Sequence, residues 1–147
     1  GVVVALFLLL LLAHQGKSVA SKPTDIEALA KEYAQLRQQK RALNPGEFNK
    51  NLSGAGGRLE TVMDELGKRL GNPKYKEEDI IRIMGKPDEI KISGDYQPGS
   101  LGGSSTGGGV PQNAKHLIYY WRGGHAYLFF VSKGGVIQEA KWYAAGE

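Results

Sequence analysis

The last third of the chain alternates apolar and polar residues in short runs that pairs of glycines interrupt. Three such runs, at residues 115–121, 125–132 and 136–143, are rich in aromatic and aliphatic side chains, and a shorter extended run covers residues 89–92. The pairs Gly123-Gly124 and Gly134-Gly135 supply the positive φ angles that tight hairpin turns require. The pattern therefore predicts an antiparallel meander of three or four strands.

The first half of the chain has helical periodicity instead. Apolar side chains recur at i, i+3, i+4 and i+7 over residues 22–39, with Ser21 or Thr24 as the N-cap, and over residues 57–70. A shorter helix is predicted over residues 76–84, ending at Gly85. We expect the two longer helices to pair antiparallel and, with the short helix, to pack on the sheet. The predicted fold class is α+β.

The chain is divided by composition into three parts. Residues 2–13 form an apolar run of about a dozen residues, which matches the core of a signal peptide and is shorter than the roughly 20 residues of a membrane span. Residues 1–20 are therefore predicted to be a signal peptide, cleaved after Ala20, or alternatively an uncleaved anchor. A helical hairpin at residues 21–74 and a helix plus meander at residues 75–147 follow as one globular unit. We expect a secreted or extracytoplasmic protein, or a membrane-anchored one.

Composition excludes several classes of function. The chain has no cysteine, which excludes a disulfide framework, a thiolate metal site, a catalytic thiol and a lipid-modified N-terminal cysteine. The net charge is +4, and the basic and acidic residues are interspersed along the chain. A dispersed charge gives no focused positive field, so we expect no nucleic-acid partner. Residues 94–109 are rich in glycine and serine and predict a flexible connector; they lack the lysine and spacing of a P-loop. We expect no cofactor.

Two histidines are the candidates for catalysis. His116 and His125 flank one predicted hairpin, which would suit an acid/base pair or two metal ligands of a small hydrolase. A metal site needs three or four converging donors, and neither strand of that hairpin contains an aspartate or glutamate. We therefore expect neither a catalytic residue nor a metal site, and keep a histidine-dependent hydrolase as an alternative.

Aromatic side chains on the predicted sheet suggest binding instead. Both faces of the sheet carry bulky side chains, so each needs a cover: helices that wrap both faces, a partner protein, self-association or a lipid surface. Tryptophan, tyrosine and arginine dominate interface hot spots, and the predicted partner-binding residues are Tyr120, Trp121, Arg122, Tyr127 and Trp142. Asn51 begins an N-glycosylation acceptor in a predicted loop. We interpret Arg37, Lys40 and Arg41 as cations that complement a helix dipole.

Three segments of the second half carry a family resemblance. Residues 76–88, 117–121 and 127–137 read KEEDIIRIMGKPD, LIYYW and YLFFVSKGGVI. This helix ending in Gly-x-Pro, followed by an aromatic meander, resembles the SmpA/OmlA-like (BamE-like) domains, small periplasmic modules. The resemblance implies a non-catalytic scaffolding or binding module at a membrane or in an extracytoplasmic space. The lipid-attachment cysteine of those lipoproteins is absent and the preceding helical pair is additional, so neither outer-membrane assembly nor any binding residue is carried over. A single-span subunit of a membrane complex is the alternative.

Overall fold

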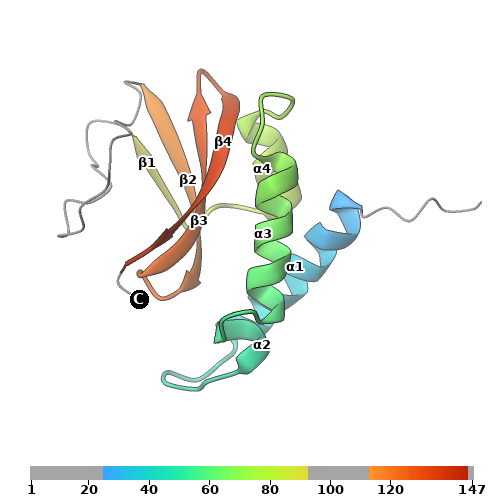
Figure 1. Ribbon diagram of the computed structural model, residues 1–147, viewed down its shortest axis with the longest axis vertical. Coiled ribbons are helices and arrows are strands. Elements are labelled where there is room, and N and C mark those ends of the chain that lie inside the picture. The colour runs from blue at the N-terminus through green and yellow to red at the C-terminus, as the bar shows by residue number, and fades with distance from the viewer. Residues whose placement is uncertain (1–24, 93–112, 146–147) are drawn as a thin grey trace, which may run out of the picture.

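Four antiparallel strands form one sheet in the computed structural model, which describes residues 25–92 and 113–145. The strands follow the order β1-β2-β3-β4: β1 (Glu89–Ile92), β2 (Ala114–Arg122), β3 (Ala126–Lys133) and β4 (Val136–Ala144). The helices precede them: α1 (Ile26–Arg41), α2 (Lys50–Ser53), α3 (Arg58–Leu70) and α4 (Glu77–Met84). The longer helices lie on one face of the sheet (Figure 1). The predicted α+β class and its antiparallel meander are confirmed.

Helix α1 begins later than the sequence pattern predicts. Its N-cap is Asp25, whose Oδ1 accepts a hydrogen bond from the backbone N–H of Glu27 at 3.2 Å. The predicted N-caps, Ser21 or Thr24, are therefore wrong, because Asp25 directly precedes the first helical residue, Ile26. Ser21 and Thr24 themselves lie outside the described residues. Only Tyr33 and Leu36 of this helix are buried, and Ile26 and Leu29 pack against the core while partly exposed.

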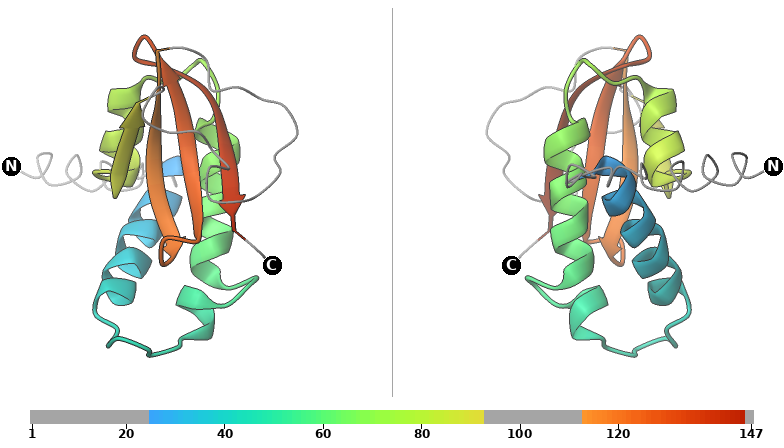
Figure 2. Two further views of the ribbon diagram at one scale, coloured as in Figure 1. Left: turned by 90° about the vertical axis from the view of Figure 1, so that its left-hand side faces the viewer. Right: turned by 90° about the vertical axis from the view of Figure 1, so that its right-hand side faces the viewer.

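Helices α2 and α3 are separate, because glycines interrupt the chain between them. Asn49 caps α2 by accepting from the N–H of Asn51 at 3.0 Å, and α2 ends at Gly54. Helix α3 then buries the predicted apolar stripe completely: Leu59, Val62, Met63, Leu66 and Leu70. It runs antiparallel to α1, and the two helices contact each other as predicted (Figure 2).

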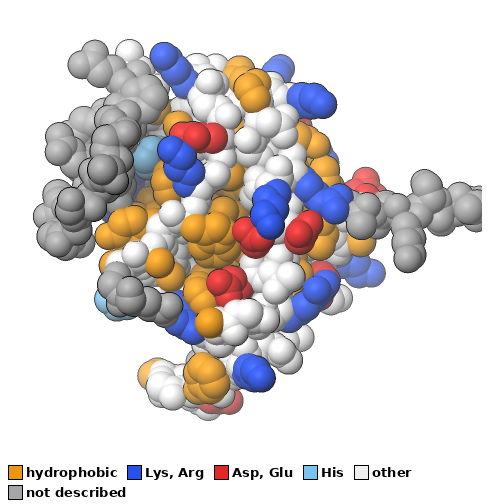
Figure 3. Space-filling model, in the orientation of Figure 1, with side chains coloured by type: hydrophobic (Ala, Val, Ile, Leu, Met, Phe, Trp, Pro, Cys, Tyr) orange, Lys and Arg blue, Asp and Glu red, His pale blue; other side chains and the backbone are white. Residues whose placement is uncertain are grey.

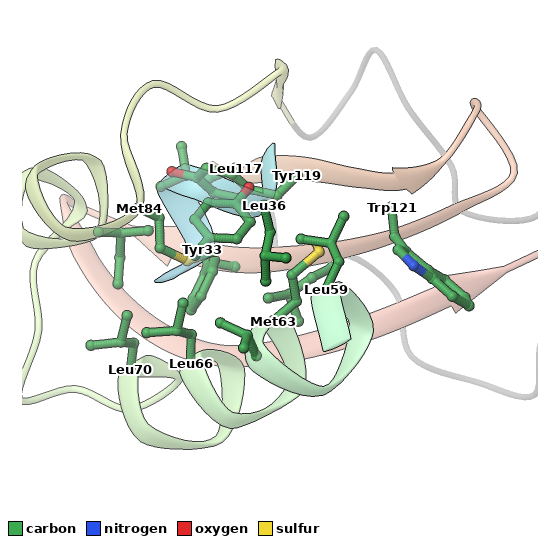
Figure 4. Packing of buried hydrophobic residues seen from close by; sticks show 14 of the residues in the cluster. Tyr33, Leu36, Leu59, Met63, Leu66, Leu70, Met84, Leu117, Tyr119 and Trp121 are labelled. Atoms are coloured by element: carbon green, nitrogen blue, oxygen red, sulfur yellow. The ribbon is translucent and has the colours of Figure 1, made fainter. Parts of the chain in front are cut away.

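The core is one cluster of side chains between the helices and the sheet. Tyr33 and Leu36 of α1, the α3 stripe and Met84 of α4 meet the inner face of the strands (Figure 4). The strand residues of this cluster are Leu117, Tyr119, Trp121, Ala126, Leu128, Phe130 and Ile137. Side chains from residues 25–70 and 75–145 therefore share a core.

The face of the sheet that points away from α1, α3 and α4, called the second face, is covered by no helix among the described residues (Figure 2). His116, Ile118 and Tyr127 point to this face, and each is at most 5% exposed. The rings on this face pack on one another: His116 lies 4.8 Å from Phe129, and Tyr127 lies 4.9 Å from Tyr143, between ring centroids. The hypothesis that the helices wrap both faces is wrong for the described helices, because α1, α3 and α4 all lie on one side (Figure 2).

No helix within the two described ranges has the length and hydropathy to cross a membrane. The predicted signal peptide or anchor at residues 1–20 and the glycine- and serine-rich connector at residues 94–109 lie outside those ranges. Both stay predictions.

Candidate functional site

The predicted partner-binding residues do not share one face of the sheet. Tyr120 and Tyr127 are opposite each other in the β2–β3 register, and Tyr127 is opposite Tyr143 of β4. Their rings form a row across the second face, with centroids 5.5 Å apart between Tyr120 and Tyr127. Tyr120 also donates its hydroxyl hydrogen to Glu89 of β1. This half of the predicted set is brought together.

Trp121 and Trp142 lie on the other face, against the helices. Trp121 belongs to the core cluster, and its ring meets that of Trp142 edge-on at 6.1 Å. Trp142 donates from Nε1 to Asp64 of α3 at 3.2 Å. Arg122 donates from Nε to the carbonyl of Ser53 at 2.6 Å, and its guanidinium lies 4.4 Å from the centre of the Trp121 ring. The prediction of a single aromatic face is wrong, because successive strand residues point to opposite faces.

The two histidines lie at opposite ends of the β2–β3 hairpin. His116 is opposite Val131, whereas His125 lies in the turn and donates its backbone N–H to Arg122 at 3.0 Å. Six strand residues at about 3.3 Å each separate them by roughly 20 Å. Burial lowers the pKa of His116. The geometry does not form the pair that a histidine-dependent hydrolase needs, and no group of three or more metal-ligating side chains converges among the described residues.

Asn51, the predicted glycosylation acceptor, lies in helix α2. The prediction that it lies in a loop is wrong, because Asn49 caps a single helical turn here. The residue is exposed, and its modification stays a prediction.

A different group of residues converges where α1 meets the corner between α4 and β1. Arg37 of α1 donates from Nη1 to the carbonyl of Met84 at 3.4 Å, and from Nη2 to the carbonyl of Lys86 at 3.0 Å and Oδ1 of Asp88 at 2.7 Å. Its side chain is 13% exposed. A planar guanidinium can serve three acceptors at once because its donors form a fixed fork. Arg37 therefore holds the end of α4 and the turn before β1 against α1.

Asp88 extends this corner to the sheet. Its Oδ2 accepts the backbone N–H of Tyr120 at 2.9 Å, while Oδ1 pairs with Arg37 and, at 3.5 Å, with Arg41. Lys40 donates to the carbonyls of Tyr120, at 3.4 Å, and of Trp121. Burial lowers the pKa of Lys40, and the charge of Asp88 acts in the opposite direction. The C-terminal half of α1 is thus bonded to β2 as well as to α4.

Two tyrosines close this corner from the core side. Tyr119 donates its hydroxyl hydrogen to the carbonyl of Gly85 at 2.8 Å, at the residue where positive φ ends α4. Tyr33 packs edge-on to Tyr119, and its buried hydroxyl has no hydrogen-bond partner among the described residues. Burial raises the pKa of both phenols well above its usual value, so both stay protonated.

This difference predicts different effects of the same substitution at the two tyrosines. Tyr119→Phe is expected to lower the free energy of unfolding by about 1 kcal/mol, because it removes a part-buried hydrogen bond to the carbonyl of Gly85. Tyr33→Phe is expected to leave it unchanged or raise it, because the buried hydroxyl that it removes is unpaired. Urea denaturation of the two variants measures both. Equal losses in the two variants would contradict this assignment.

A hollow of about 690 Å³ opens beside this corner, between α1 and the α4–β1 segment. Four cationic side chains line it, Arg37, Arg41, Arg82 and Lys86, and Asp88 is the single acid among its lining residues. The side chains of Arg41 and Arg82 are 66% and 70% exposed. The hollow therefore offers positive charge to an incoming acidic group.

The remaining charge on the surface is interspersed. In the view of Figure 3, acidic and basic side chains alternate over the described residues, and no broad area of one sign is present on that face. Several of these charges form ion pairs within one helix, such as Lys68 with Asp64 at 2.7 Å. The basic hollow is thus a local feature, consistent with the small net charge of the chain.

The sequence gives only a partial signal for this site. Arg37, Lys40 and Arg41 are visible as a cluster, and Lys40 and Arg41 do lie in the last turn of α1. Their interpretation as dipole-complementing cations misses their bonds to β2, to the end of α4 and to the turn before β1. Most of those acceptors are backbone carbonyls, which every residue has, so nothing in the residue pattern marks them.

The resemblance to SmpA/OmlA-like domains over residues 76–137 stays a prediction. The α4–β1 corner and the meander have the element order on which it rests. Comparisons of the chain with protein-family models, with curated proteins and with solved structures find no significant match.

Proposed function

We propose that this chain is a non-catalytic binding module whose partner docks acidic side chains into the hollow between α1 and the α4–β1 segment. The observation that carries the proposal is the charge of this hollow, where four cations face one acid. Asp88 is already paired with Arg37 and bonded to Tyr120. Arg41 and Arg82 form long ion pairs, with Asp88 and Asp79 at 3.5 Å each, and their side chains are exposed, so they and Lys86 are the cations that a ligand can reach.

The hollow is also held rigid, which suits recognition. Its floor is the corner that Arg37 and Tyr119 fix by bonds to backbone carbonyls of α4 and the following turn. A site that is already ordered loses less conformational entropy when a ligand binds. The predicted leader or anchor at residues 1–20 supports a secreted or membrane-tethered place for this module. The contact of a partner with Tyr120 and Tyr127 stays a separate prediction.

The proposal is tested by selecting binders from displayed random peptides of about 16 residues, the length of α1. Selected peptides are expected to be rich in aspartate and glutamate and to bind the double variant Arg41→Glu/Lys86→Glu about tenfold more weakly, because each exposed charge pair contributes about 0.2–1 kcal/mol and the reversal turns two attractions into repulsions. Affinity should also fall with added salt. Fluorescence anisotropy measures both.

The matched control reverses two exposed lysines outside the hollow, in Lys50→Glu/Lys133→Glu, with the same change of net charge. This control is expected to bind the peptides as the unmodified protein does. Equal weakening in both double variants would show that net charge, and not the hollow, determines binding. A selection that yields no binders would contradict the proposed function.

A further inference from the structure

The basic hollow continues into a second one along α1. This second hollow has a volume of about 470 Å³ and is lined by Asp25, Ile26, Glu27, Ala30, Tyr75, Arg82 and Ile83. Arg82 and Ile83 of α4 line both hollows. The two hollows therefore adjoin at α4, and the pair of them, along the same side of α1, is called the groove between α1 and α4.

One side of α1 forms the wall of this groove from end to end. At 100° per residue, its lining positions fall on one face of the helix: Ile26, Ala30, Ala34, Arg37, Gln38 and Arg41. From Ile26 to Arg41 the rise of 1.5 Å per residue gives a groove about 22 Å long. A helix of about 16 residues has the same length.

The groove has opposite charges at its two ends and small side chains in its middle. Asp25 and Glu27 lie at the start of α1, whereas Arg41 and Lys86 lie at the other end. Ala30 and Ala34 lie between them, and small side chains allow another backbone to approach closely. Side chains spaced by four residues form the ridges against which a second helix packs.

We infer that the groove binds an amphipathic helix of a partner protein, antiparallel to α1, with acidic residues in its first turn and basic residues in its last. The inference rests on the proposed function and specifies the partner. An antiparallel helix places its acidic first turn beside Arg41 and Lys86 and its basic last turn beside Asp25 and Glu27. This charge order is also the one that favours helix formation, because it complements the helix dipole.

We assign the occupant to another molecule, because the residues of the sequence that lie outside the described ranges lack the required acids. Residues 1–24 contain no aspartate or glutamate. Residues 93–112 contain one acid, Asp95, and residues 146–147 contain Glu147. None of these segments provides an acidic turn followed by an apolar stripe and a basic turn.

The test uses the tightest peptide from the selection described above, as a synthetic peptide. A central proline substitution in that peptide is expected to weaken binding about tenfold or more, because proline breaks a helix. Glu27→Lys in the protein is expected to weaken binding several-fold, and neutralising the basic end of the peptide should remove this sensitivity. Circular dichroism of the mixture should show added helix.

Filling the middle of the groove provides an independent variant. Ala34 is exposed, so Ala34→Trp should leave the fold intact and block the peptide, whereas Gln39→Trp, at an exposed position outside the groove lining, should not. Acidic peptides that bind without helix formation and ignore Glu27→Lys would overturn the inference and leave the proposed function standing. A dimer of the chain that dissociates when peptide is added would overturn it too, since a second copy would then be the occupant.

Discussion

Replacing Arg37 by alanine is expected to lower the free energy of unfolding by about 2–3 kcal/mol. The substitution leaves Asp88 without its closest cation and removes the donor from the carbonyls of Met84 and Lys86. The two side chains are 13% and 24% exposed, so the loss combines a partly shielded charge left behind at Asp88 with two carbonyls that lose their donor. Urea denaturation monitored by circular dichroism measures the loss.

Two variants separate this effect from a change of charge. Arg37→Lys keeps the charge but not the planar fork, so it should recover only part of the stability. Arg41 is the second cation near Asp88; its side chain is 66% exposed, and its Nη2 lies 3.5 Å from Oδ1 of Asp88. Arg41→Ala should therefore lower the free energy of unfolding by about 0.5 kcal/mol or less. If Arg41→Ala destabilised the protein as much as Arg37→Ala, a general attraction to Asp88 would explain both, and the three-acceptor role of Arg37 would be wrong.

Gly71→Ala is expected to destabilise the protein by about 2–3 kcal/mol through a steric clash. Gly71 ends α3 beside the edge strand β4, and a Cβ atom there would lie 2.6 Å from the backbone nitrogen of Ala140 and 2.7 Å from its Cβ. The backbone of Ala140 cannot rotate out of the way as a side chain can, so α3 and β4 would have to separate. Thermal denaturation measures the loss of stability, and the NMR signal of the Ala140 amide reports the separation of α3 from β4.

The chain offers graded controls for this prediction. Gly67→Ala would meet the end of the Leu128 side chain at 2.9 Å, which can rotate, so a smaller loss is expected. Gly124→Ala meets nothing within 4 Å and should be neutral. Adding Ala140→Gly to Gly71→Ala should restore part of the stability. A neutral Gly71→Ala variant would show that α3 does not approach β4 this closely.

The strands and helices could be predicted from the sequence because each has a local signature. The alternation in β2 and β3 places Leu117 and Tyr119 on one face and His116 and Ile118 on the other, and the structure has them there. The Leu59 to Leu70 stripe is buried as its spacing predicts. Both signatures depend on residues within one element, where the period of the backbone determines the side.

The candidate site could not be predicted because it depends on contacts between distant segments. The prediction of one aromatic binding face grouped Tyr120, Trp121 and Trp142 by residue type, although Tyr120 lies on the opposite face of the sheet from the two tryptophans. The groove depends on how α1 crosses α4, which no spacing within either helix specifies. Arg37 and Met84 are 47 residues apart in the chain, and the acceptor is a carbonyl.

The bonds of Lys40 to β2 have a consequence for the order of events during synthesis. Trp121, whose carbonyl accepts from Lys40, lies 81 residues later in the chain. At roughly 5–20 residues per second, about 4–16 s pass between the synthesis of the two residues. Helix α1 can pack on α3 before β2 is made, but its bonds to the sheet have to wait for β2. The bonds that join the C-terminal half of α1 to the sheet can therefore form only in the last part of synthesis, after β2 has been made.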